Sequence, residues 1–243
     1  TAPQNKKVVL EEFTGVNCTY CPLGHAEASQ IKDANPGQVF IINVHEGNFA
    51  VPTGAQPDFR TAFGTLLSDQ SGLSGYPSGT VNRHVFSGLS QSVGTTAMSR
   101  QNWSAATSQT LSQSSYVNVA ATASINALTR VATILVEAYY TGSSPVATNK
   151  LNVALLQNNS FAYQAGAASQ GENYNHGHRL VNLLTGQWGE NITTTTAGTL
   201  VSRTFTYTIP SAYNNIPAEM GNFEIIAFVA ESNQEIISGN AAT

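Results

Sequence analysis

The 243-residue sequence predicts an α/β domain followed by an all-β domain built as an antiparallel sandwich. The first domain is predicted by a strand-like run that ends shortly before Cys18 and Cys21, and by helical periodicity that begins near Cys21. The second is predicted by a change of period: from Tyr116 onward apolar residues alternate with polar ones, as in strands with one buried face. We predict domains at residues 1–114 and 115–243.

The first domain alternates between predicted strands and helices. In chain order these are a strand at about 6–14, a helix at 21–34, a strand at 39–44, a helix at 58–67, a turn at 75–83 that enters a strand, and a helix at 96–111. The first helix ends at the breaker sequence Asn35-Pro36-Gly37. The second has apolar residues at i, i+3 and i+4 spacing from Phe59, with Pro57 in its first turn.

The second domain consists of short β-rich runs separated by Gly, Ser, Asn and Pro turns. The runs cover 116–125, 131–140, 151–157, 202–209, 223–230 and 236–237. This spacing is typical of an immunoglobulin-like or jelly-roll-like sandwich of about seven strands. Residues 161–198 have weak periodicity, and we expect a long loop there with one short strand.

The composition indicates an exported protein. Only 10% of the residues are charged, against roughly 25% in a typical soluble domain, and hydroxyl and amide side chains are abundant. The net charge of −4 and the absence of a basic run argue against a nucleic-acid partner. No apolar run reaches the length of about 18 residues typical of a transmembrane segment. No signal peptide opens the sequence at Thr1, so we expect a processed product, outside the cytoplasm.

Cys18 and Cys21 are the only cysteines, and they stand where the first helix is predicted to begin. The unpaired amides and the positive dipole end of a helix stabilise a thiolate there. Cys18 is the more N-terminal, so we predict that it is the attacking thiolate and that Cys21 resolves the mixed disulfide. In an oxidising compartment the resting form is expected to be the disulfide.

Two further elements complete the predicted site. Glu12, six residues before Cys18 on the incoming strand, is expected to point inward and to exchange a proton with the second cysteine, whereas Glu11 points the other way. A cis-proline facing a disulfide leaves backbone groups free to pair with a substrate chain, and the Tyr76-Pro77 bond is the candidate.

Other interpretations compete with the redox site. Cys18 and Cys21 could form a stable structural disulfide, or they could bind zinc together with His25. No second cysteine pair supports the zinc site, and Pro22 excludes covalent haem attachment because a histidine would be required there. We predict no metal and no cofactor.

The sequence Tyr174-Asn175-His176-Gly177-His178-Arg179 suggests a second metal hypothesis. Alternate residues of a strand face the same way, so two imidazoles could share a metal. No acidic residue is close in sequence, and we favour a packing or hydrogen-bonding role for His176 beside Trp188.

The order strand–helix–strand, the Cys-x-x-Cys at the helix start, the carboxylate at Glu12 and the proline before a late strand resemble the thioredoxin-like fold. This resemblance implies that Tyr76-Pro77 is cis. Thioredoxin relatives usually carry an aromatic residue before the first cysteine, where this chain has Asn17. General cytosolic reductase activity is therefore not implied.

A second resemblance covers nearly the full length. It rests on 9–15, 75–83, 174–179 with 188–190, and 226–229. In these segments the chain resembles the Bacteroidota surface family named for an outer membrane protein of roughly 28 kilodaltons. The resemblance does not imply a particular biochemical activity, because a fold alone does not define one. The resemblance implies an N-terminal thioredoxin-like domain, a C-terminal β domain and a location at the outer membrane surface or outside the cell.

These observations predict an exported or cell-surface protein with a dithiol/disulfide site that exchanges with protein substrates or a redox partner. The alternative is a non-catalytic surface binding or structural protein in which the disulfide is inert. In that case its β domain would contact partners, glycans or an outer membrane assembly.

Overall fold

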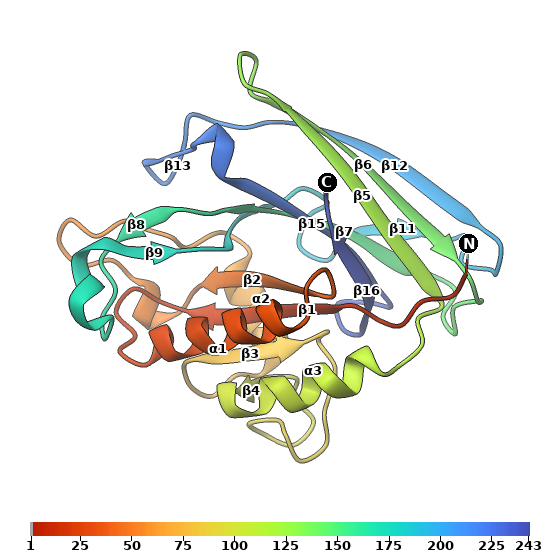
Figure 1. Ribbon diagram of the computed structural model, residues 1–243, viewed down its shortest axis with the longest axis horizontal. Helices are drawn as coiled ribbons and strands as arrows, with labels where there is room; N and C mark the ends of the chain where they lie inside the picture. Colours follow the sequence, from red (N-terminus) through yellow and green to blue (C-terminus); the bar gives the residue numbers. More distant parts are fainter. Residues whose placement is uncertain (1) are drawn as a thin grey trace.

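The computed structural model describes residues 2–243 and shows a mixed α/β fold in which strands predominate (Figure 1). The helices are α1 Cys21–Ala34, η1 Asn48–Ala50, α2 Gly64–Ser71, η2 Arg100–Asn102, α3 Trp103–Leu111, η3 Ala168–Asn173 and η4 Met220–Asn222. The strands up to residue 140 are β1 Val8–Thr14, β2 Val39–His45, β3 Ser78–Val81, β4 Met98–Ser99, β5 Val117–Asn126 and β6 Val131–Tyr140. The later strands are β7 Asn149–Gln157, β8 Ser160–Ala162, β9 Tyr174–His176, β10 Arg179–Leu183, β11 Glu190–Ile192, β12 Leu200–Thr208, β13 Ala212–Tyr213, β14 Ile216–Pro217, β15 Phe223–Ala230 and β16 Ile236–Ala241.

One large sheet runs through both halves of the chain. Its strand order is β16-β15-β7-β10-β2-β1-β3-β4, and β11 pairs with β7. Strands β1 and β2 are parallel and connected through α1, while β3 is antiparallel to β1. Strand β10 joins the two halves because it pairs with β7 on one side and with β2 on the other. The sheet therefore contains strands from both sides of residue 114, where the sequence predicts the limit between two domains.

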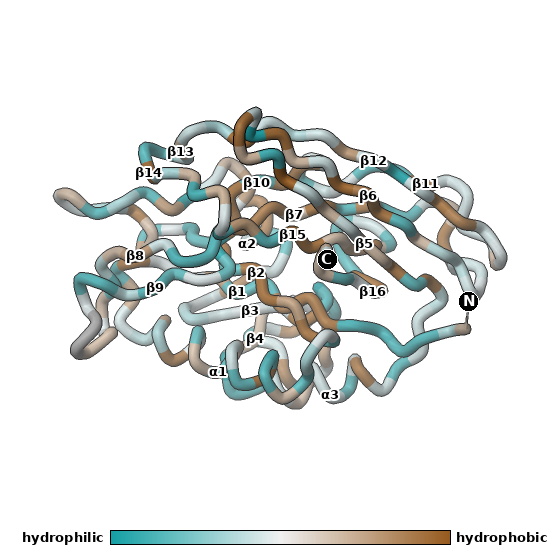
Figure 2. Tube along the Cα trace, turned by 45° about the horizontal axis from the view of Figure 1, so that its top comes forward, coloured by the Kyte–Doolittle hydropathy of each residue, from teal (hydrophilic) through white to brown (hydrophobic). Residues whose placement is uncertain are grey.

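Three sets of elements pack against the faces of this sheet. Helices α1 and α3 pack on one face of β1–β3 around Leu10, Ile41 and Trp103, and Leu67 of α2 packs against the opposite face. The three-stranded sheet β12-β6-β5 lies over the C-terminal strands of the large sheet and shares an apolar core with β7 and β15 (Figure 1). Hydrophobic stretches follow strands such as β6, β7 and β15 in Figure 2.

Strand β1 is buried along its whole length, so both of its faces pack against protein. Its even-numbered residues face α1, and this face includes Leu10 and Glu12. Glu11 faces the other side, where its carboxylate accepts hydrogen bonds of 2.7 and 2.5 Å from the Arg83 guanidinium. The predicted inward orientation of Glu12 is confirmed, and Glu11 points the opposite way as expected.

The predicted strand–helix–strand unit at the N-terminus is confirmed, as are the entry into β3 and the long strands β5, β6, β7, β12 and β15. The helix predicted at 58–67 has the wrong bounds: α2 spans Gly64–Ser71, and Phe59 lies before it, packed against His45 and His176. The helix predicted at 96–111 begins only at Trp103, since Met98 pairs with Gly79 in a strand.

The single short strand predicted within 161–198 is also wrong. This region contains part of β8 and the strands β9, β10 and β11. The strands are short, between three and five residues, so their alternation spans too few residues to give a periodic signal.

Candidate dithiol site

Cys18 and Cys21 form a disulfide at the start of α1. Cys21 is the first residue of the helix, and Cys18 lies in the loop that links it to β1, where its backbone N–H donates to Gly15 O at 3.0 Å. Both residues are buried, with 3% of Cys18 and none of Cys21 exposed. The helix end favours a thiolate at this point of the chain, while burial limits attack from solvent.

The carboxyl group of Glu12 is fully buried, and neither of its oxygens has a hydrogen-bond partner within the described residues. Burial raises the pKa of Glu12 well above its usual value, because desolvation disfavours the ionised carboxylate. It lies against Gly24, one turn after Cys21, where a Cβ atom would collide with Glu12 Oε1. The carboxyl group is thus packed under the first turn of α1.

Pro77 lies beside the same glycine. The Tyr76-Pro77 peptide bond is cis, as predicted, and a Cβ atom at Gly24 would lie 2.9 Å from Pro77 Cβ. Tyr76 donates a hydrogen bond from its hydroxyl group to Glu46, and its ring packs edge-on against Phe49 with centroids 5.4 Å apart. The structure therefore brings Glu12, Cys21 and Pro77 around one turn of α1.

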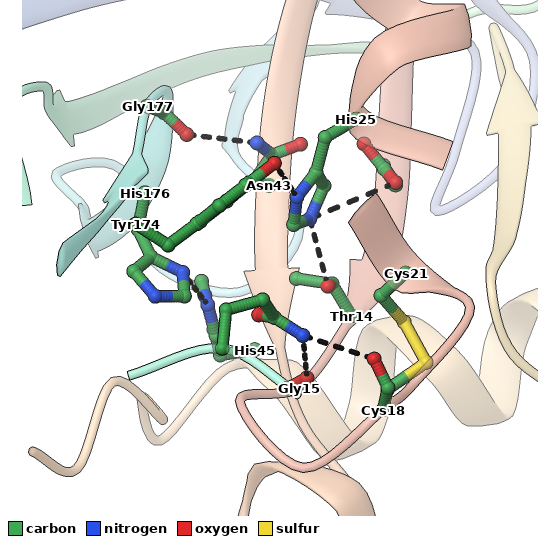
Figure 3. Close-up of polar contacts among 12 residues, drawn as sticks. Thr14, Gly15, Cys18, Cys21, His25, Asn43, His45, Tyr174, His176 and Gly177 are labelled. Carbon is green, nitrogen blue, oxygen red and sulfur yellow. Dashed lines mark hydrogen bonds and ion pairs between the residues drawn. A yellow bond between two sulfur atoms is a disulfide. The ribbon is translucent and has the colours of Figure 1, made fainter. Parts of the chain in front are cut away.

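His25 extends this cluster toward the C-terminal half of the chain. Its Nε2 atom lies 2.9 Å from Thr14 Oγ1 and 3.9 Å from Glu12 Oε1, and its Nδ1 atom lies 2.8 Å from the Tyr174 hydroxyl (Figure 3). Burial, with a smaller contribution from the nearby His176, lowers the pKa of His25 to about 3, so the imidazole is neutral at physiological pH.

Tyr174 was not predicted as a site residue, because it contacts α1 across 149 positions of sequence. Burial, reinforced by the Glu12 carboxyl, raises the pKa of Tyr174 to about 12, so its hydroxyl group keeps its proton. A cavity of about 420 Å³ opens between α1 and residues 174–178, and its lining includes Glu12, His25 and Tyr174. Glu12 thus borders this cavity on the side of α1 that faces β9, although its carboxyl oxygens are themselves buried.

A pair of histidines, His45 and His176, lies next to Tyr174. His45 Nε2 and His176 Nδ1 are 3.3 Å apart, and both rings pack on Phe59. Burial lowers the pKa of His45 well below its usual value and that of His176 to about 4. Arg179 stacks over Phe59 at 4.8 Å and donates to Gln157 Oε1 at 2.7 Å.

His176 and His178 do not point toward a common metal-binding position. His176 ends β9 and contacts His45, whereas His178 lies in the following turn with a positive φ of 52° and contacts Glu224 Oε2 at 2.7 Å. The packing and hydrogen-bonding role expected for His176 is confirmed, but its neighbours are His45 and Phe59, whereas Trp188 lies next to Arg83. Within residues 2–243 no group of three or more His, Cys, Asp or Glu side chains could hold a metal ion.

The family described as Outer membrane protein Omp28 matches residues 65–241. The chain belongs to this family. The match confirms the family that the sequence resembles, and the family places the protein at the outer membrane surface or outside the cytoplasm, as predicted. No curated protein sequence matches the chain. None of the helices in residues 2–243 is long and apolar enough to cross a membrane.

Two solved structures share this fold over nearly the whole chain, and a third is similar to part of it. HBP35 of Porphyromonas gingivalis is similar over 99% of this chain and 76% of its own, with a TM-score of 0.78 and 19% identity. A structural-genomics protein of Agrobacterium tumefaciens is similar over 99% of this chain and 96% of its own, with a TM-score of 0.59 and 11% identity. A domain of the outer membrane lipoprotein Omp28 from Porphyromonas gingivalis covers 53% of this chain and 88% of its own, with a TM-score of 0.37 and 17% identity.

Proposed function

We propose that this chain is a thiol–disulfide exchange protein of the Bacteroidota cell surface, with a thioredoxin-like unit at residues 1–114 and a β-sandwich unit at 115–243. The strand order β2-β1-β3-β4, with β1 parallel to β2 and antiparallel to β3, supports the first unit. The apolar core shared by the β12-β6-β5 sheet and the large sheet supports the second. The continuous sheet makes the two units one folded body.

The observation that carries the redox proposal is the buried, unpartnered carboxyl group of Glu12 beneath the disulfide-bearing turn. An unsatisfied polar group costs stability when it is buried, by about 1–3 kcal/mol. An inert disulfide has no use for such a group, whereas a disulfide that opens needs a proton for the leaving thiolate. Glu12 holds that proton and exchanges it with solvent through the cavity beside His25.

In the proposed reaction a substrate thiolate attacks Sγ of Cys18 and forms a mixed disulfide, while the Cys18–Cys21 bond breaks. The electron pair leaves on the sulfur of Cys21, which takes the proton from Glu12. A second substrate thiolate then attacks the substrate sulfur of the mixed disulfide, and Cys18 leaves as a thiolate stabilised by the helix end. Two electrons pass from the substrate dithiol to this protein. The reverse sequence reduces a substrate disulfide.

Protein substrates fit the surroundings of the site. Tyr20 and Leu23 on the α1 side are 65% and 49% exposed, and Phe49 and Val51 on the neighbouring loop are 45% and 41% exposed. The carbonyl groups of Phe49 and Val51 accept hydrogen bonds from Asn17, the residue before Cys18. Exposed apolar side chains next to a cis-proline favour an extended polypeptide segment as the ligand.

A second candidate function rests on the burial of the disulfide. With 3% of Cys18 and none of Cys21 exposed, the bridge also fits a non-catalytic surface binding or structural protein. Its partner would then be another component of the outer membrane surface.

The reduction potential separates the two functions. The protein is equilibrated in glutathione or dithiothreitol buffers, and the free thiols are quantified by alkylation. We expect a potential between about −120 and −270 mV and a Cys18 thiolate pKa below about 7.5, as in thiol–disulfide catalysts. A potential below about −300 mV, or a bridge that reacts only in denaturant, would establish the structural function instead.

A further inference from the structure

The excursion between β7 and β10, residues 158–178, forms an arm that contains β8, η3 and β9 and reaches across to the disulfide loop. Within this arm, residues 163–167 lie directly on the loop 15–19 that carries Cys18; we call this segment the cap. The arm belongs to the C-terminal half of the chain, whereas the loop follows β1. The contact therefore joins segments that are about 150 residues apart in sequence, as in the bonds from Gln164 to Gly15 and Cys18.

Hydrogen bonds hold the cap in place. Gln164 is 1% exposed, and its Nε2 atom donates to the carbonyl oxygens of Gly15 at 3.2 Å and Cys18 at 2.9 Å (Figure 3). The backbone N–H of Ala165 donates to Val16 O at 2.8 Å. The cap thus occupies three backbone acceptors on the loop of the attacking cysteine.

The cap also approaches the loop too closely for a side chain. Gly166 has a φ of 76°, and a Cβ atom there would collide with the Thr19 carbonyl oxygen and lie 2.8 Å from Thr19 C. Only glycine fits this contact without moving one of the two backbones. Thr19 stands between the two cysteines, so the contact lies on the disulfide loop itself.

Two contacts anchor the rest of the arm beside the site. The Tyr174 hydroxyl group is hydrogen-bonded to His25 on α1, and His176 lies 3.3 Å from His45 at the end of β2. His25, His45 and His176 all have lowered pKa values and are neutral at physiological pH, so charge repulsion does not open the arm there. The closed position is the resting one.

We propose that the cap is an autoinhibitory segment that shields the Cys18–Cys21 disulfide, and that thiol exchange requires the cap to leave the loop. This inference rests on the proposed redox function and specifies how that site is regulated. A thiolate must approach the disulfide along the sulfur–sulfur axis, so access controls the rate. A partner that binds the arm in an open position would switch the site on by shifting the population of the open form.

The test compares rates of disulfide reduction in folded, oxidised protein. Gly166→Ala forces the cap away from Thr19, and Gln164→Ala removes the side-chain bonds to Gly15 and Cys18 without adding volume. Gly171→Ala is the matched control, because it lies in the same arm, has no positive φ, and a Cβ atom there meets nothing within 4 Å. Each protein is treated with excess dithiothreitol, and the freed thiols are counted by quenching with a maleimide at timed intervals.

We expect Gly166→Ala and Gln164→Ala to be reduced at least tenfold faster than the wild type, and Gly171→Ala to be reduced at the wild-type rate. If both cap variants are folded by circular dichroism and their disulfides are reduced at the wild-type rate, the proposal that the cap shields the disulfide is refuted. If Gly166→Ala fails to fold, the rate of Gln164→Ala decides alone. The equilibrium reduction potential of the wild type separates the two proposals: a structural potential refutes the redox function, whereas unchanged rates at a catalytic potential refute only the cap.

Discussion

Replacing Glu12 by glutamine should stabilise the oxidised protein by an amount that grows with pH. In the unfolded chain Glu12 ionises near its ordinary value of 4.5, but in the folded protein burial raises its pKa well above that value. Between the two values the folded wild type binds one proton more than the unfolded chain. Its free energy of unfolding therefore falls by about 1.4 kcal/mol per pH unit from this group alone.

The Glu12→Gln side chain has nearly the same size and no titratable proton. The difference in unfolding free energy between variant and wild type should therefore rise by about 1.4 kcal/mol for each pH unit above 4.5, and level off at the pKa of Glu12 in the folded state. The pH at which the difference levels off is the pKa of Glu12 in the folded protein. A proton donor to Cys21 requires this pKa to be well above the ordinary value of a carboxyl group.

Urea unfolding of both proteins at pH 5, 6, 7 and 8, with the disulfide intact, measures this difference, and all other titrating groups cancel in it. Asp58→Asn is a suitable control because hydrogen bonding to Arg60 lowers the pKa of Asp58, so its effect should not change with pH across this range. Parallel stability curves for Glu12→Gln and the wild type would mean that Glu12 is already ionised when folded. That result would refute its role as the proton donor.

Three further outcomes follow from the same contacts. Glu11→Gln leaves the buried Arg83 guanidinium without its carboxylate and should lower the unfolding free energy by about 3–5 kcal/mol in urea titrations; a loss under 1 kcal/mol would show that the pair is dispensable. Gly24→Ala should destabilise the protein in thermal unfolding, although alanine favours helices by about 1 kcal/mol, because the methyl group meets the Pro77 ring; a raised midpoint would contradict this packing. Since the pKa of His176 falls to about 4 on folding, the unfolded chain binds more protons below pH 6.5, and stability should drop as the pH falls from 6.5 to 4. His176→Asn should remove about 3 kcal/mol of that drop, and an unchanged pH profile would contradict the buried neutral imidazole.

The sequence predicted those parts of the site that depend on local patterns. Glu12 could be oriented from the alternation of a strand, and Cys21 could be placed at a helix start from the helical periodicity that begins near it. The cis form of the bond before Pro77 came from a family resemblance, and the structure confirms it. Each of these inferences needs only a few neighbouring residues and one element type.

The missed residues depend on tertiary contacts. His25 could as well have been on an exposed helix face, and only its contacts with residues such as Tyr174 show why it is mostly covered. Phe59 has the spacing of a helical residue, yet it lies before α2, buried with Val16 and Ala162 and against the rings of His45 and His176. Periodicity reports which residues are apolar, but it cannot report which partner covers them.

The position of the arm follows from the strand order of the large sheet. Strands β1 and β2 are parallel, so their carboxyl ends meet at one edge, where the loop to Cys18 begins. Strand β10 pairs with β2 through Arg179 and Asn43, close to that same edge. The chain between β7 and β10 must therefore emerge beside the disulfide loop. By adding a strand to the free edge of β2, the C-terminal half both completes the sheet and brings the cap to the site, so the two halves would be coupled in folding and in reactivity.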